Sequence, residues 1–298
     1  MASVSSLEQA SAALRAASAE GRTVRIGTDL DAPGMSLVLE HEAGDLTCTV
    51  EAGIRLSALA AALAPSGQRL SLDPPGDPTV GACLAGNLSG PLRHRFGAPR
   101  DLVLGVTLVL ADGTIVNAGG KVVKNVAGYD LGKLVCGSRG RLAFIGRVSL
   151  RLHPAPVAAA TIVVETGDPA SVAAELLASQ LVPSALDVLH PGRVAVLFEG
   201  GAAAVAAQVR ATRALVGGDE ADHSVWEESR ARQAAALGRT SFAPGALRGF
   251  LEGAPAAVVR PAAGIAYLST AARDETPVPV RLLQERVRER FDPGGVLA

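Results

Sequence analysis

Two stretches of small residues restrict the folds that this chain can adopt. Residues 71–90 read SLDPPGDPTVGACLAGNLSG, and a second glycine-rich stretch covers residues 119–140. Glycine reaches backbone conformations closed to other residues and lets a backbone or a ligand approach closely, so both stretches predict tight loops. The 298-residue chain as a whole is 48% hydrophobic, which is enough for a sizeable core. This length fits two domains, although one large domain is also compatible with it.

Short strands and helices surround the two stretches. Helices are predicted at 6–20, where Ser6 and Gln9 form a capping box, and at 54–64. Strands are predicted at 23–26, 36–39, 46–50 and 142–152, and 102–110 with 113–118 form a hairpin. The segment 153–156 reads HPAP and predicts a domain boundary, because proline lacks a backbone donor and disfavours a continuing strand.

A different pattern follows that boundary. The order of the predicted elements is βαββαβ, which is typical of a ferredoxin-like unit. Its members are strand 160–165, helix 169–180, strands 185–190 and 193–199, helix 202–216 and strand 219–223. A helix at 225–237, a strand at 265–269 and a helix at 278–291 follow, while 240–262 has no clear pattern. We therefore expect an α+β protein with domains at 1–154 and 155–298.

Charge and motif content exclude several classes of protein. With 28 basic and 29 acidic side chains, the chain has no electrostatic footprint for nucleic acid. Its three cysteines form no C-x-x-C pair, and its five histidines never stand at metal-ligand spacing, so no metal or iron–sulfur site is expected. The N-terminus does not read as a signal peptide, and no apolar run approaches the roughly 18 residues of a membrane span. A reduced, cytoplasmic setting is the expectation.

The first glycine-rich stretch suggests an anion site. Small residues at 79–90 let backbone N–H groups approach a phosphate, and a helix starting near Val80 adds its dipole. The alternative is a tight loop packed under a sheet. In the second stretch, Lys121 and Lys124 could form an anion pocket or line a substrate cleft, and the alternative is that these lysines are solvated and Tyr129 simply packs.

Several motifs together resemble a known family. KNVAGYDL at 124–131 is followed by GSRG at 137–140, PPG stands at 74–76, GAPRDLVLGV at 97–106, and FDPGGVL at 291–297. This set resembles the FAD-binding E subunits of glycolate oxidase, within the vanillyl-alcohol oxidase superfamily of PCMH-type FAD-binding proteins. The resemblance is dense over 45–155, sparse through the middle of the following region, and returns at the C-terminus.

The resemblance implies a PCMH-type FAD-binding domain of two α+β lobes with FAD between them, followed by a cap domain with an antiparallel sheet. It places 79–90 at the FAD pyrophosphate and 137–145 at the adenine and ribose. FAD would be bound non-covalently, because the first loop has no histidine. The implied cofactor contacts are Gly27, Thr28, Pro75, Gly76, Thr79, Val80, Gly81, Ala82, Gly86, Asn87, Ser89, Gly90, Gly137, Gly140, Leu142 and Ile145. Lys124, Asn125 and Tyr129 are candidates for a catalytic pocket on the flavin side.

One segment departs from the family pattern. The first phosphate loop of the family is rich in glycine, whereas here 27–31 reads GTDLD. Asp29 and Asp31 would place negative charge near a pyrophosphate, and this repulsion weakens binding unless the side chains turn away.

Three functions remain open on these grounds. The leading one is an FAD-binding oxidoreductase subunit of a complex that oxidises glycolate or another 2-hydroxy acid, in which the flavin accepts or relays electrons. Its partners would be a catalytic flavin subunit and an iron–sulfur subunit, through which it could associate with a membrane. The alternatives are a non-catalytic assembly subunit with a degenerate FAD site, and a stand-alone flavin dehydrogenase for an alcohol or acid.

Overall fold

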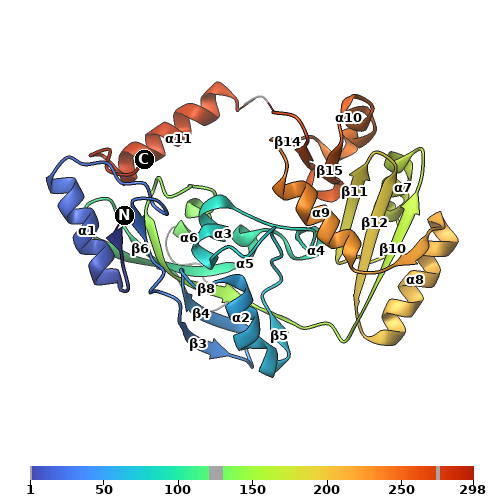
Figure 1. Ribbon diagram of the computed structural model, residues 1–298, viewed down its shortest axis with the longest axis horizontal. Coiled ribbons are helices and arrows are strands. Elements are labelled where there is room, and N and C mark those ends of the chain that lie inside the picture. Colours follow the sequence, from blue (N-terminus) through green and yellow to red (C-terminus); the bar gives the residue numbers. More distant parts are fainter. Residues whose placement is uncertain (1, 121–129, 273–275) are drawn as a thin grey trace.

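The computed structural model describes residues 2–120, 130–272 and 276–298. The molecule is elongated, with a five-stranded sheet towards one end and a seven-stranded sheet towards the other (Figure 1). We refer to residues 2–154 as the N-terminal part and to residues 155–272 as the C-terminal part. This mixed architecture confirms the α+β fold class expected from the sequence.

The sheet of the N-terminal part is antiparallel, with the strand order β3-β4-β8-β6-β7. The predicted hairpin and the strong strand after the second glycine-rich stretch are both confirmed. The strands are β3 (Val38–Glu42), β4 (Thr47–Glu51), β6 (Val103–Val109), β7 (Ile115–Gly119) and β8 (Phe144–Arg151). Helices α2 (Leu56–Leu63), α3 (Val80–Gly86) and α6 (Leu131–Val135) contribute to its core, which includes Leu59, Leu84 and Val148.

A small lobe packs beside this sheet. Helix α1 (Leu7–Ala19) is capped by Ser6, whose hydroxyl accepts from the Gln9 N–H as the capping motif predicts. The lobe includes β1 (Ala2–Ser3), parallel to β2 (Leu30–Asp31), and residues 296–297, which return to Val24. The predicted strand at 23–26 is wrong: the chain turns at Gly27, and only isolated bridges form at Val24 and Ile26.

The C-terminal part confirms the βαββαβ prediction. Its elements are β10 (Ala158–Glu165), α7 (Pro169–Ala178), β11 (Ala185–His190), β12 (Arg193–Gly200), α8 (Ala202–Val216) and β13 (Asp219–Ala221). The sheet order β13-β10-β12-β11-β15-β16-β14 contains the ferredoxin-like order and adds three strands beyond β11. The unpatterned region holds part of β14 (Gly238–Ser241), together with α10 (Leu247–Gly253) and β15 (Ala257–Arg260); β16 (Ile265–Leu268) follows.

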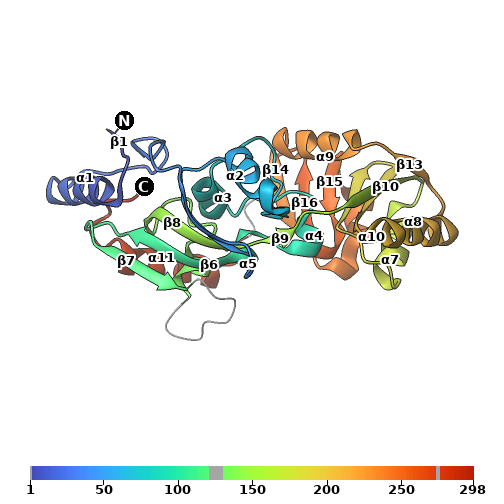
Figure 2. The same cartoon turned by 90° about the horizontal axis from the view of Figure 1, so that it is seen from below.

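The two faces of the seven-stranded sheet have different neighbours. One face forms a core with α7, α8 and α10. The other face packs against α9 (Ser224–Ala234) through Trp226 and against Leu92. Leu92 immediately precedes α4 (Arg93–Phe96) of the N-terminal part, so this face of the sheet is turned towards the N-terminal part (Figures 1 and 2).

A long surface helix precedes the C-terminal residues. Helix α11 (Val278–Phe291) follows the C-terminal part and leads back to the small lobe (Figure 1). It has no fully buried residue, although Val287 and Phe291 are partly covered. Across the described residues, no helix is both long and apolar enough to cross a membrane.

Candidate functional site

Three segments that are distant in sequence meet at the side of the five-stranded sheet. The N–H groups of Gly137 and Arg139 donate to the carbonyl oxygens of Leu84 and Ala85 in α3, at 2.9 and 2.8 Å. Gly140 lies against the first loop, since a Cβ built on it would stand 2.8 Å from Cβ of Ile26. The loop at 25–31, helix α3 and the loop at 137–145 therefore form one contiguous region.

Small residues leave backbone exposed in this region. Gly27 has φ +85° and no atom within 4 Å of a Cβ placed on it. Gly137 has φ +86°, and a Cβ there would approach only Asn87, at 3.7 Å. Ala82 and Gly86 of α3 are exposed as well. No bulky side chain covers Gly27 or Gly137, so an extended ligand could approach the backbone closely there.

Two buried polar atoms at this region lack a partner. Within the described residues, Asn87 Oδ1 and Ser138 Oγ have no hydrogen-bond partner although both are buried. Asn87 caps the end of α3 with φ +47°, and Ser138 follows Gly137. A buried oxygen without a partner is costly, so these atoms fit a site where a ligand supplies the missing hydrogen bonds. The hydroxyl groups of FAD could donate to either oxygen, and the Ser138 hydroxyl could also donate to a phosphate.

The start of α3 corrects one expectation from the sequence. Its first N–H groups were expected to approach an anion, but they are already used within the chain. Val80 N donates to Ile54 O at 2.9 Å, Gly81 N to Ala52 O at 2.7 Å, and Ala82 N to the Thr79 hydroxyl at 3.1 Å. The close approach of the Ala52 carbonyl depends on Gly81, because a Cβ there would stand 3.0 Å from that oxygen.

One of the two carboxylates in the first loop, that of Asp29, has a counter-charge. The Asp29 carboxylate accepts from the backbone N–H of Arg25 and from its guanidinium, at 2.9, 3.1 and 3.3 Å. These hydrogen bonds hold the pKa of Asp29 below its ordinary value. Asp31 Oδ1 accepts from Ala32 N at 2.8 Å. The negative charge of Asp29 is therefore directed at Arg25.

The other implied contacts occupy different positions. Leu142 and Ile145 are buried, and Ile145 pairs with Leu108 inside the sheet, so only their backbones are available. Pro75 and Gly76 lie in a turn before Asp77, whose carboxylate accepts from Ser57 in α2. The roles of these four residues remain predictions. Lys124, Asn125 and Tyr129 lie outside the described residues.

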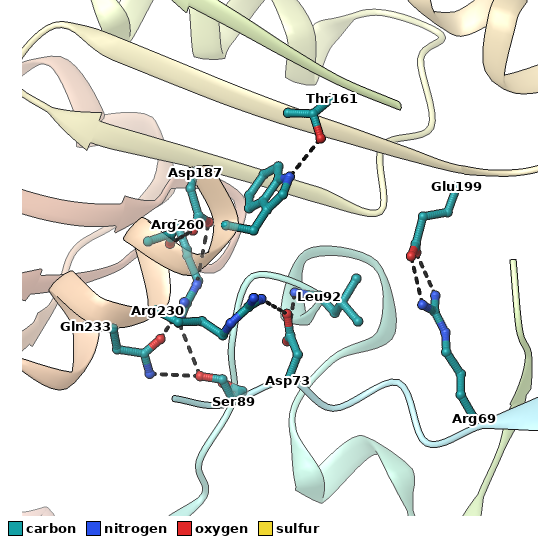
Figure 3. A network of polar contacts seen from close by, with 12 residues as sticks. Arg69, Asp73, Ser89, Leu92, Thr161, Asp187, Glu199, Arg230, Gln233 and Arg260 are labelled. Carbon is teal, nitrogen blue, oxygen red and sulfur yellow. Dashed lines mark hydrogen bonds and ion pairs between the residues drawn. The ribbon is translucent and has the colours of Figure 1, made fainter. Parts of the chain in front are cut away.

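Ser89 and Gly90 stand where the two parts of the molecule meet. Gly90 is required there by packing, since a Cβ would come 1.8 Å from the Asp73 carbonyl oxygen. The carbonyl of Ser89 accepts from Gln233 Nε2 at 2.9 Å and from Arg260 Nη1 at 3.3 Å (Figure 3). The predicted cofactor loop therefore ends in direct contact with α9 and β15.

Further polar contacts join the two parts at this junction (Figure 3). Arg69 binds Glu199 through two hydrogen bonds of 2.7 and 2.6 Å. Asp73, which accepts from Leu92 N within the N-terminal part at 3.1 Å, lies 3.7 Å from Arg230 of the C-terminal part. Sequence reasoning missed all of these residues, because single charged residues far apart in sequence carry no local signal of a shared contact.

Burial strongly affects the carboxylates of the junction. It raises the pKa of Asp73 to about 7, against the opposing attraction of Arg260 and Arg230. Asp187 is fully buried and accepts from the Ser229 hydroxyl at 2.5 Å, with Arg260 Nε 3.5 Å away. Burial raises its pKa too, against the attraction of Arg260.

The structure has two hollows, one on the five-stranded sheet and one at the junction between the two parts. A hollow of about 630 Å³ lies on the five-stranded sheet, with Gly120 among its lining residues, and the chain enters the undescribed segment 121–129 directly after Gly120. A smaller one of about 120 Å³ lies at the junction, lined by Arg69, Asp73, Trp226 and Arg230 among others. No group of three or more His, Cys, Asp or Glu side chains in the described parts of the chain could hold a metal ion.

The fold and the converging loops have counterparts in known proteins. A family model described as "FAD binding domain" matches residues 26–119, which contain the first loop and α3. Two crystal forms of alkyldihydroxyacetonephosphate synthase share the fold, with TM-scores of 0.73 and 0.75 at 16% and 14% identity. Both alignments cover 99% of this chain and 74% of the other. Residues 26–119 thus resemble an FAD-binding domain, and the chain as a whole shares the fold of this synthase.

Several curated proteins are similar to this chain in sequence. Glycolate oxidase subunit GlcE of Escherichia coli K12 is 33% identical over 218 residues, covering 72% of this chain and 61% of that one. Glycolate oxidase subunit GlcD of Bacillus subtilis is 32% identical, covering 52% and 34%. A mitochondrial D-lactate dehydrogenase (cytochrome) of Saccharomyces cerevisiae is also 32% identical, covering 52% and 27%. The chain is therefore related to glycolate oxidase subunits and D-lactate dehydrogenases, and it spans less than two thirds of the length of each.

Proposed function

We propose that this chain is the FAD-binding redox subunit of a complex that oxidises glycolate or a related 2-hydroxy acid. The observation that carries the proposal is the meeting of the loop at 25–31, helix α3 and the loop at 137–145 around exposed glycines and the unpartnered Asn87 Oδ1. The similarity to two glycolate oxidase subunits supports the substrate class.

The cofactor and the residues of the chain have separate tasks. Bound FAD supplies a two-electron acceptor, and the protein supplies binding and orientation. Gly27 and Gly137 allow the backbone to approach the ligand, and Asn87 Oδ1 and Ser138 Oγ take up its hydrogen bonds. Arg25 compensates Asp29, so that the first loop tolerates a pyrophosphate. Lys124, Asn125 and Tyr129 remain proposed for the flavin-side pocket.

The wider setting belongs to the same proposal. A catalytic flavin subunit and an iron–sulfur subunit are the proposed partners, in the cytoplasm or at a membrane reached through these partners. We place the domain boundary near 154, where β9 (His153–Pro154) precedes the first strand of the seven-stranded sheet. The FAD-binding domain would then be 1–154, and the cap domain would be 155–298 with α11 leading back to the FAD-binding domain.

Asn87 provides a direct test of the cofactor site. Replacing Asn87 by Gly keeps a residue that tolerates φ +47° and removes the side chain with its amide, so we expect FAD affinity to fall about tenfold, the equivalent of one neutral hydrogen bond. The measurement is the dissociation constant of FAD from fluorescence titration of the apoprotein. Arg139→Gly is the matched control, since Arg139 has φ +54° and an exposed side chain in the same region. Equal FAD affinity in Asn87→Gly and wild type would contradict the assignment.

One observation favours a second candidate, a non-catalytic assembly subunit. The first N–H groups of α3 are occupied within the chain, which leaves fewer donors for a pyrophosphate. Protein without flavin that still restores the activity of the complex would support this candidate. A stand-alone flavin dehydrogenase predicts instead that the isolated chain reduces an artificial electron acceptor in the presence of substrate.

A further inference from the structure

The face of the C-terminal sheet that is turned towards the N-terminal part carries a row of three polar side chains. Arg239 on β14 and Tyr267 on β16 are direct cross-strand partners, so their side chains share a face. Tyr267 is also paired with Val258, which belongs to the cluster that contacts Leu92. Arg260 lies two residues after Val258 and hence on the same face, with its guanidinium carbon 4.9 Å from the centre of the Tyr267 ring.

A third arginine faces this row from the N-terminal part. Arg93 begins α4, and its Nη1 donates to the Ser89 hydroxyl at 3.2 Å. The pKa of Arg93 is lowered, first by burial and then by repulsion from Arg239 and Arg260, while Tyr267 and Asp101 attract it. Arg93 directly follows Leu92, which packs in the same cluster as Val258 of this face, and Arg93 and Arg260 both donate to Ser89. The Arg93 side chain therefore lies beside this row.

Of the three guanidinium groups, only that of Arg260 has a carboxylate as its counter-charge within the described residues. Arg260 is 1% exposed and has Asp187 as its counter-charge, with further bonds to Gln233 and Ser89. Among the described residues, neither Arg93 nor Arg239 has a carboxylate within ion-pair distance. Asp101, which attracts Arg93, accepts from the N–H of Ala98 at 2.8 Å. Like charges that face each other without a counter-charge are unfavourable, and a bound anion would relieve this repulsion.

We propose that Arg93 and Arg239 form a binding site for the carboxylate group of a small organic acid, beside the ring of Tyr267. Guanidinium groups bind carboxylates through paired, charge-assisted hydrogen bonds, and an aromatic ring covers the apolar side of a small ligand. The site rests on the proposed function, because Ser89 joins Arg93 to the end of the proposed FAD-binding loop. This subunit then recognises its own organic acid next to its cofactor, in addition to any acid bound by a partner subunit.

Oxalate is a suitable probe, since it carries carboxylates and is not a substrate for hydride removal. We expect the purified, FAD-loaded full chain to bind oxalate in a calorimetric titration. Arg239→Leu and Arg93→Gln should each raise the dissociation constant about tenfold or more, as expected for the loss of one charge-assisted pair. Arg286→Leu on α11, an exposed arginine outside the junction, is the matched control and should leave the constant unchanged.

The outcomes separate this inference from the proposed function. Wild-type protein that carries FAD but does not bind oxalate, or variants that bind it as tightly as wild type, would overturn the carboxylate site and leave the FAD-binding function intact. Protein that cannot be loaded with FAD but still binds oxalate in an arginine-dependent way would support the site and contradict the proposed function. Thermal unfolding of each variant identifies misfolding, and Arg239 is the decisive position because it is exposed and has no ion pair to lose within the described residues.

Discussion

Asp73 organises the turn at which the predicted cofactor loop meets the C-terminal part. Its carbonyl fits against Gly90 with no room for a Cβ, and its carboxylate accepts from Leu92 N and faces Arg230. Only 19% of its side chain is exposed. One residue thus fixes the backbone before Arg93 and contacts α9, yet nothing in its local sequence distinguishes it from an ordinary acidic turn residue.

The raised pKa of Asp73 predicts a pH dependence of stability. The folded state holds the proton up to about pH 7, whereas the ordinary value of the carboxyl is 3.8, so the folded state binds more protons between these values. Stability therefore decreases as pH rises through this window. Asp73→Asn keeps the acceptor for Leu92 N and removes the titration, so we expect its free energy of unfolding to fall less than that of wild type between pH 4 and about 7.

Urea unfolding of the two proteins across that pH range checks this prediction. Asp219→Asn, a change at a fully exposed carboxylate, is the control and should follow the wild type. Parallel pH profiles for Asp73→Asn and wild type would show that Asp73 does not titrate in this range.

At the scale of elements, segments with a long or regular apolar pattern were predicted correctly, and short segments were not. The bounds of β11, α8 and α11 agree with the sequence analysis, because each has a long or regular apolar pattern. Strand β15 was missed because its four residues are all buried, and a short apolar run without alternation does not distinguish a strand. The segment at 23–26 was overestimated because a short β-prone run carries no information about the turn at Gly27.

Some features of the candidate site could be predicted from the sequence and others could not. Its glycine-rich loops could be found from the sequence, because glycines that admit close approach and positive φ recur in recognisable motifs. The internal hydrogen bonds of the Val80 and Gly81 N–H groups could not be found, because their acceptors, Ile54 and Ala52, lie far away in the sequence. Arg93, Arg239 and Arg260 become neighbours only when α4 packs against the seven-stranded sheet.

The contact between β11, β15 and α9 yields a prediction for stability. Arg260→Met leaves the fully buried Asp187 with only the Ser229 hydroxyl as a partner, and we expect a loss of about 3–5 kcal/mol in the free energy of unfolding. The double variant Arg260→Met with Asp187→Leu removes both charges and should recover much of this loss. Chemical denaturation of the single and double variants is the measurement. A double variant that is less stable than Arg260→Met would contradict the role of the unpaired charge.

At the scale of the whole molecule, the C-terminal residues pack against the small lobe formed by the N-terminal residues. The C-terminal part follows the five-stranded sheet, packs against α4, and continues through α11 to residues that join Val24 in the small lobe. The first loop, α3 and the loop at 137–145 then border one region, while Ser89 and Arg93 reach from it to the junction. Cofactor and organic acid would therefore be held by different parts of a single continuous structure.

The visible absorption spectrum of the purified chain, after incubation with FAD and gel filtration, tests the central claim most directly. The account predicts that the oxidised flavin bands near roughly 370 and 450 nm stay with the protein peak, and are released on denaturation because the cofactor is not covalently attached. A colourless protein peak that cannot be reconstituted with FAD would contradict the account and favour an assembly subunit.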